Sequence, residues 1–155
     1  MRVAIGIMFA LAALCTPVLR PSAFAQGVSS KTVLTIHEGA EYFPVNPLLE
    51  AGIREAVTSR SDLPVDYFAE YLESDEFPQD EASRAFADYI RRKYQGRRID
   101  LAIATTSAGL RFVLDHRAEL FPDAPIVFAA LNVPDDNVLR AGAGAAGIRL
   151  GVNLI

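Results

Sequence analysis

The stretch LAIATTSAGL, residues 101–110, joins an apolar run to three successive hydroxyl residues and then to a helical pattern. The apolar run belongs to a strand pattern over 99–105, with no polar face that would have to meet water. Thr105, Thr106 and Ser107 follow where a helix would begin, and either Thr106 or Ser107 can serve as its N-cap. A strand followed directly by a helix is the repeating unit of an α/β fold, so this stretch sets the expectation for the rest of the chain.

The same alternation of strand and helix patterns extends in both directions from this stretch. Short runs rich in apolar and β-branched residues predict strands over 32–38, 64–73, 99–105, 125–131 and 147–153. Apolar residues at helical spacing predict helices over 46–60, 80–95 and 107–121. Asn46 is expected to be the N-cap of the first helix, with Pro47 at its first position.

These patterns predict the fold class and the strand order. Strands that alternate with helices form right-handed crossover units, which build a doubly wound parallel sheet of the α/β class. One reversal of direction after the first pair of strands predicts the order 2-1-3-4, with the fifth strand beside the fourth or loose. The strand over 64–73 sets Asp66 and Glu70 against apolar residues, which is typical of a half-exposed strand near a sheet edge.

The amino terminus, residues 1–25, has the organisation of a secretory signal peptide. Arg2 precedes an apolar run of about a dozen residues, and Ala23-Phe24-Ala25 has the small-x-small pattern of a cleavage site. The alternative is an uncleaved membrane anchor, but Arg20 and Pro21 interrupt the run well before the roughly 20 apolar residues that a membrane span requires. We therefore expect export to a bacterial periplasm.

Export determines the expected domain organisation. A short linker over 26–31 would lead to a single α/β ligand-binding lobe over 32–155, and a composition of 51% hydrophobic and 22% charged residues fits one globular domain. The strand over 147–153 is an unusual end for such a fold, so the lobe is expected to be truncated at its C-terminus.

Removal of the leader also determines the cysteine content and the charge of the mature chain. Cys15 would be lost, which leaves no disulfide, thiol nucleophile or thiolate metal site. The mature chain would carry 13 basic residues against 19 acidic ones, a net charge of −6 that argues against nucleic acid as a partner.

Polar residues stand where the predicted strands end. In an open parallel sheet the loops at the carboxyl ends of the strands converge on one crevice, where ligands bind. The candidate ligand-binding residues all lie in these loops: His37, Glu38, Tyr42, Thr105, Thr106, Ser107 and Asn132. Hydroxyls at a helix N-terminus lie beside free backbone N–H groups that favour an anionic or carbonyl group, although Ser107 can equally be a simple N-cap.

Other chemical signals predict neither catalysis nor a cofactor. No second histidine or cysteine lies at metal-binding spacing from His37, His116 is expected on a helix surface, and no serine lies in a Gly-x-Ser-x-Gly motif. Gly142 to Gly147 match the letters of a dinucleotide-binding motif but lead into a strand rather than a helix. A solvated acidic rim is expected at Glu70, Glu73, Asp75 and Glu76.

The segment YIRRKYQGRRIDLAIATTSAGLRFVLDHRAELFPDAPIVFAALN, residues 89–132, resembles part of the first lobe of the ABC-type substrate-binding-protein-like family. Similar segments form the periplasmic sensor regions of bacterial histidine kinases. The most specific parts are Gly-Arg-x-x-Asp-Leu at 96–101, Arg-x-Glu-Leu-Phe-Pro at 117–122 and Pro-Ile-Val-Phe-Ala at 125–129. The resemblance covers about 31–132.

The resemblance implies one lobe of a periplasmic-binding-protein-like fold, in which two lobes clamp a small molecule. The contacts of the first lobe would fall on His37, Glu38, Thr105 to Ser107 and Asn132. It further implies a second lobe, a membrane permease or a kinase region as partners, and a binding function without catalysis. A small exported α/β enzyme that uses the same crevice is the alternative.

Overall fold

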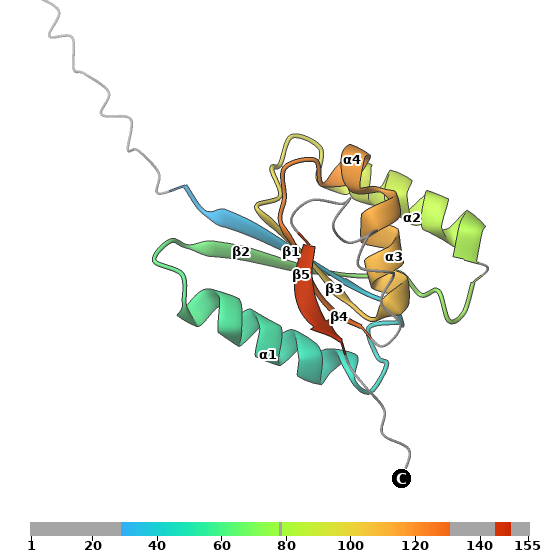
Figure 1. The fold of residues 1–155 in the computed structure, drawn as a ribbon, viewed down its shortest axis with the longest axis horizontal. Coiled ribbons are helices and arrows are strands. Elements are labelled where there is room, and N and C mark those ends of the chain that lie inside the picture. The colour runs from blue at the N-terminus through green and yellow to red at the C-terminus, as the bar shows by residue number, and fades with distance from the viewer. Residues whose placement is uncertain (1–28, 78, 131–144, 150–155) are drawn as a thin grey trace, which may run out of the picture.

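The computed structural model describes residues 29–77, 79–130 and 145–149 as one α/β unit around a single sheet (Figure 1). The strands are β1 (Lys31–His37), β2 (Val65–Tyr71), β3 (Leu101–Thr105), β4 (Ile126–Ala130) and β5 (Ala145–Arg149). The helices are α1 (Asn46–Ser59), α2 (Gln79–Lys93), α3 (Ser107–Asp115) and α4 (Arg117–Leu120). All neighbouring strands are parallel and their order is 2-1-3-4-5, which confirms the predicted fold class and places the fifth strand beside the fourth.

The helices cover the two faces of the sheet unequally. Figure 1 shows α1 on one face and α2, α3 and α4 on the other. The larger core lies on the three-helix side, where Leu34, Ile90 and Phe112 are among its buried residues. The smaller core lies under α1 and is built around Val33, Tyr67 and Ile103. Both faces of β1 and β3 are thus covered, as the continuous apolar pattern of these strands requires.

One region of the sheet has no described helix over it. On the α1 side, Val127 of β4 and Ile148 of β5 are 42% and 66% exposed, because α1 lies over the β1–β2 half. No helix in the described part of the chain is long and apolar enough to cross a membrane.

The predicted single helix over 107–121 is wrong in one respect, because it is divided at His116. The backbone of His116 leaves the helical conformation between α3 and α4. Its side chain is only 18% exposed, with Nε2 3.3 Å from Oγ of Ser83 and the ring 4.8 Å from that of Phe112. The expected surface position of His116 is therefore also wrong, since tertiary contacts with α2 hold it at the break.

Glu70 does not belong to a solvated rim. It faces the larger core at 5% exposure, where it accepts a hydrogen bond of 2.6 Å from the hydroxyl of Tyr94. The ammonium of Lys93 lies 2.6 Å from the same carboxylate oxygen. A buried carboxylate needs such partners to offset its lost hydration, and they come from the last residue of α2, Lys93, and from Tyr94 directly after it.

Candidate functional site

A cavity of about 200 Å³ lies where the sheet changes winding direction, between the loops that follow β1 and β3. The two loops diverge there because α1 and α3 cover opposite faces of the sheet, and ligands of open α/β folds bind at this point. The lining residues come from the β1–α1 loop, the β2–α2 connection and the start of α3: Glu38, Gly39, Phe43, Val45, Asn46, Asp75 and Thr106.

Asn46 fixes the loop that forms the first wall. Its side-chain amide is buried and donates hydrogen bonds to the carbonyl oxygens of Gly39 at 3.2 Å and Ala40 at 2.8 Å. The prediction that Asn46 caps α1 is therefore wrong, since the N-cap is Val45 and has no side-chain cap bond. Buried loop carbonyls need a donor, and this need determines where the Asn46 amide points. The loop is consequently held in one conformation over the cavity.

Thr106 forms the opposite wall in a strained conformation. It is the N-cap of α3, with φ of 99° and ψ of 168°, a region that side-chain-bearing residues rarely adopt. Its backbone N–H donates to the Ala129 carbonyl at 2.7 Å, and its hydroxyl accepts from the Gly109 N–H at 3.3 Å. A Cβ at Gly109 would lie 3.0 Å from the carbonyl oxygen of Ile36, so α3 begins directly against the end of β1. These contacts fix the conformation of Thr106.

His37 and Thr105 lie beneath the cavity and not in its wall. Both are buried, with Nδ1 of His37 2.9 Å from Oγ1 of Thr105. The imidazole stacks on Tyr71 with ring centroids 5.2 Å apart, and the Tyr71 hydroxyl donates to Glu50 at 2.7 Å. Burial lowers the pKa of His37, against an opposing attraction from Glu50. A neutral imidazole therefore links the two strand ends, and its buried Nε2 has no hydrogen-bond partner among the described residues.

The structure brings together only part of the predicted set. Glu38 and Thr106 line the cavity, and Ser107 follows Thr106 as the first residue of α3. Tyr42 is 77% exposed and does not line it; its hydroxyl donates to Glu76 at 2.6 Å, which raises the pKa of Tyr42. Asn132 lies outside the described residues.

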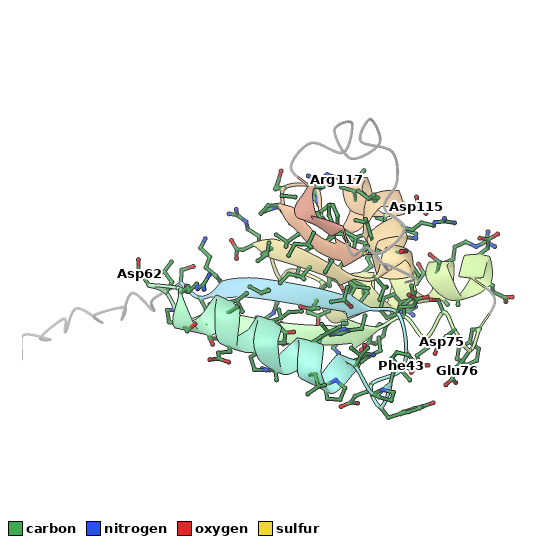
Figure 2. All side chains as sticks on the ribbon, turned by 60° about the horizontal axis from the view of Figure 1, so that its bottom comes forward. Phe43, Asp62, Asp75, Glu76, Asp115 and Arg117 are labelled. Atoms are coloured by element: carbon green, nitrogen blue, oxygen red, sulfur yellow. The ribbon has the colours of Figure 1, made fainter. Side chains whose placement is uncertain are left out.

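Most residues of the first wall, and the residue contributed by the loop after β2, were not predicted from the sequence. Phe43, Val45 and Asn46 lie beyond the first few residues of the β1–α1 loop, and no pattern in the sequence shows that this loop folds back. Asp75 could have been found, because the loop after β2 lies at the same edge of the sheet as the other strand ends. Figure 2 shows Phe43, Asp75 and Glu76 at this edge.

The loops around the cavity are strongly acidic. Residues 38–46 and 72–77 contain no lysine or arginine but carry five carboxylates: Glu38, Glu41, Glu73, Asp75 and Glu76. No described residue forms a hydrogen bond or an ion pair with the carboxylates of Glu38 or Asp75, the two that line the cavity. Both acceptors are therefore available to a ligand.

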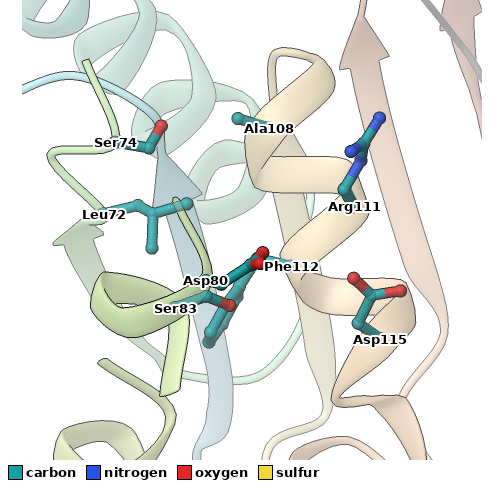
Figure 3. Close-up of a pocket in the computed structure, with 8 residues that line it drawn as sticks. All are labelled: Leu72, Ser74, Asp80, Ser83, Ala108, Arg111, Phe112 and Asp115. Carbon is teal, nitrogen blue, oxygen red and sulfur yellow. The ribbon is translucent and has the colours of Figure 1, made fainter. Parts of the chain in front are cut away.

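A second cavity lies on the three-helix side of the same edge (Figure 3). Asp80 and Ser83 of α2 face Arg111 and Asp115 of α3 across it. Its volume of about 60 Å³ has room for only a few water molecules. It is consequently too small for an organic ligand.

A larger apolar groove of about 370 Å³ runs between the end of β2 and the outer side of α2, where Phe77 and Phe86 are among its lining residues. Size alone would favour this groove as the ligand site. However, β2 is an edge strand, so only one strand end borders the groove. The cavity between β1 and β3 collects side chains from three loops, which is the usual arrangement of an α/β ligand site.

The described lining of the cavity offers two carboxylates, an amide and a hydroxyl. It contains no histidine, lysine or cysteine, and no described general base contacts the Thr106 hydroxyl. No group of three or more metal-ligating side chains converges within the described residues. Ala145, Ala146 and Gly147 of the glycine motif belong to β5, so the motif leads into a strand, as its sequence context predicts.

No protein-family model matches the chain. No curated protein matches its sequence significantly.

Proposed function

We propose that the chain is a small-molecule-binding lobe of an exported periplasmic protein, of the ABC-type solute-binding kind or of the sensor region of a histidine kinase. The observation that carries the proposal is the cavity at the β1–β3 switch point, in whose lining the Glu38 and Asp75 carboxylates have no partner from the residues that the structure describes. The leader pattern over 1–25 and the family resemblance over about 31–132 support the compartment and the class of protein. A second lobe, a membrane permease or a kinase region would be the partner of the ligand-bound lobe.

The walls of the cavity support binding by a preformed site. Asn46 holds one wall through two buried hydrogen bonds, and Thr106 holds the other through its cap bond and its contact with β4. A rigid wall loses little conformational entropy when a ligand binds. The alternative of an exported enzyme would use the Glu38 and Asp75 carboxylates as acid and base, but it has less support because no nucleophile with an activating base is among the described lining residues.

Ligand-induced shifts of backbone amide resonances test the proposal. The isotope-labelled protein is titrated with a mixed panel of small amines, alcohols, carboxylates and sugars. We expect shifts concentrated in 38–46, 73–76 and 105–109 for at least one class. One lobe alone should bind weakly, with a dissociation constant on the order of millimolar, because only one side of the ligand is contacted.

Two tryptophan variants provide the matched comparison. Val45→Trp places a large ring at a lining position that is partly exposed, so it should block the cavity and abolish the shifts. Leu48→Trp makes a similar change one turn along the surface of α1, outside the lining, and should bind normally. Absence of any cavity shift with the whole panel, or equal binding by both variants, would remove the proposal.

A further inference from the structure

We infer that the ligand of this cavity is a small organic cation, an amine that carries an apolar group about the size of one ring. The inference rests on the proposed function and narrows it to one ligand class. It follows from the charge, the apolar wall and the volume of the same cavity.

The charged groups in the lining are acceptors, and the Thr106 hydroxyl can both donate and accept. The carboxylates of Glu38 and Asp75 have no hydrogen-bond or ion-pair partner among the described residues, whereas the Asn46 amide group donates to loop carbonyls. A ligand that pairs with these two carboxylates must donate hydrogen bonds, and an ammonium group does so with charge assistance. No lysine or arginine in 38–46 or 72–77 competes for the two carboxylates.

The start of α3 does not reverse this preference. A helix N-terminus carries about half a positive charge, and this one would favour an anion if it stood alone. One N–H group at this helix end, that of Gly109, donates to the Thr106 hydroxyl and is therefore not available to an anion. Glu38 and Asp75 bring two full negative charges to the same lining, so the local potential is negative. Of the anionic or carbonyl group expected from the sequence, the anionic one would be repelled.

The apolar wall and the volume of the cavity indicate the size and the apolar character of the ligand. Phe43 and Val45 are partly exposed in the lining, and Phe43 lies against Gly39, where an added Cβ would come within 3.2 Å of it. An aromatic ring beside unpaired carboxylates favours a cation with an apolar body. A cavity of about 150 Å³ holds benzene, so the observed volume of about 200 Å³ fits a single ring with a short arm.

Three probes of similar shape and different charge test the inference. Binding of 2-phenylethylamine, 2-phenylethanol and 3-phenylpropionate is followed by amide shifts at neutral pH and low salt, where screening is weakest. We expect the amine to bind about tenfold or more tightly than the alcohol, which corresponds to one charge-assisted hydrogen bond, and the carboxylate not to bind. Added salt should weaken binding of the amine and leave binding of the alcohol unchanged.

Charge-neutralising variants identify the groups responsible. Asp75→Asn and Glu38→Gln should each lower the affinity for the amine about threefold to tenfold, a range reduced by solvent screening. The affinity for the alcohol should not change. Asp62→Asn removes the same charge at the opposite end of the molecule, far from Phe43 and Asp75 in Figure 2, and should have no effect. In the described part of the chain neither Asp75 nor Glu38 has a side-chain partner, so the Asp75→Asn and Glu38→Gln variants should fold normally.

The outcomes separate this inference from the proposed function. Binding of the alcohol or the carboxylate as tight as that of the amine, sensitive to Val45→Trp, would overturn the amine preference and leave the binding function standing. Amine binding that persists in the Asp75→Asn, Glu38→Gln double variant, or that shifts residues 81–86 instead, would also overturn it. No cavity binding by any member of the mixed panel would remove the proposed function itself.

Discussion

Nδ1 of His37 and Oγ1 of Thr105 lie 2.9 Å apart in the interior, and this pair joins the last residue of β1 to the last residue of β3. The residues that follow each of them, Glu38 and Thr106, line the cavity. The register pairs Ile36 with Ala104 in the sheet, so the side-chain bond continues the β1–β3 pairing by one more residue. The pair therefore sets the distance between the two walls.

Replacement of Thr105 by valine should destabilise the fold. The valine keeps a similar shape but leaves the buried Nδ1 of His37 without its partner, which costs about 1–3 kcal/mol in the free energy of unfolding. Thr58→Val on the exposed side of α1 removes a hydroxyl bonded to a helical carbonyl and should change it by less than about 0.5 kcal/mol. Urea denaturation measures the free energy of unfolding of both variants. Equal losses would show that the buried His37–Thr105 pair contributes no more to stability than an exposed hydroxyl does.

The stability of the protein should fall as the pH drops below about 6.5, the ordinary pKa of histidine. Burial lowers the pKa of His37 in the folded state, so at falling pH the unfolded chain takes up a proton first and is favoured. The stabilisation that comes from neutral His37 is complete above the pKa of this residue in the unfolded chain. It is lost as the pH falls toward the lower pKa of His37 in the folded state. Glu50 and Asp100, whose pKa values are also lowered, act only in a more acidic range.

Unfolding free energies between about pH 7.5 and about pH 5 check this prediction. The chain has two histidines, which makes the comparison direct. His37→Gln should start from a lower stability and lose the pH dependence in this window, whereas His116→Gln should retain it. A pH dependence that persists in His37→Gln would assign the effect to another group.

Substitutions at Thr106 should reveal its backbone strain. Thr106→Ala loses the cap bond to Gly109 and keeps the positive φ, so we expect a loss of about 1 kcal/mol in the free energy of unfolding. Thr106→Gly loses the same bond but relieves a strain of about 1–3 kcal/mol, and it should be the more stable of the two.

An ordinary helical position gives the opposite order and serves as the control. Ala51→Gly on the exposed side of α1 should destabilise by about 1 kcal/mol, because glycine loses more backbone freedom on folding. A Thr106→Gly variant less stable than Thr106→Ala would mean that the residue is not strained. Chemical denaturation of the four proteins, with the parent as reference, measures the comparison.

Export should remove the leader. We expect the periplasmic product to begin at Gln26, because Ala23-Phe24-Ala25 precedes that residue as a cleavage pattern. Intact mass of the periplasmic fraction measures it, and Ala25→Pro should block processing as the control. A membrane-bound product that still begins at Met1 would establish the alternative of an anchor.

The fold could be predicted further than the site. Strand and helix types depend on the spacing of apolar residues along the chain. The predicted order 2-1-3-4 rests on right-handed crossovers with one reversal after the first pair, and the structure adds β5 beside β4. The site depends on how loops fold over the strand ends. Tyr42 and Asn46 illustrate this, since neighbouring polar residues of one loop lie on its outside and in its interior.

The sequence by itself determined the α/β class, the parallel sheet and the edge at which polar strand ends converge, because each depends on local periodicity and chain connectivity. Only the tertiary structure decided that His37 and Thr105 are buried beneath the cavity while Glu38 and Thr106 line it. It also decided that Glu70 lies inside while Asp75 lines the cavity. The physical reason is that a polar side chain turns toward whatever satisfies its hydrogen bonds, and those partners come from segments distant in the sequence.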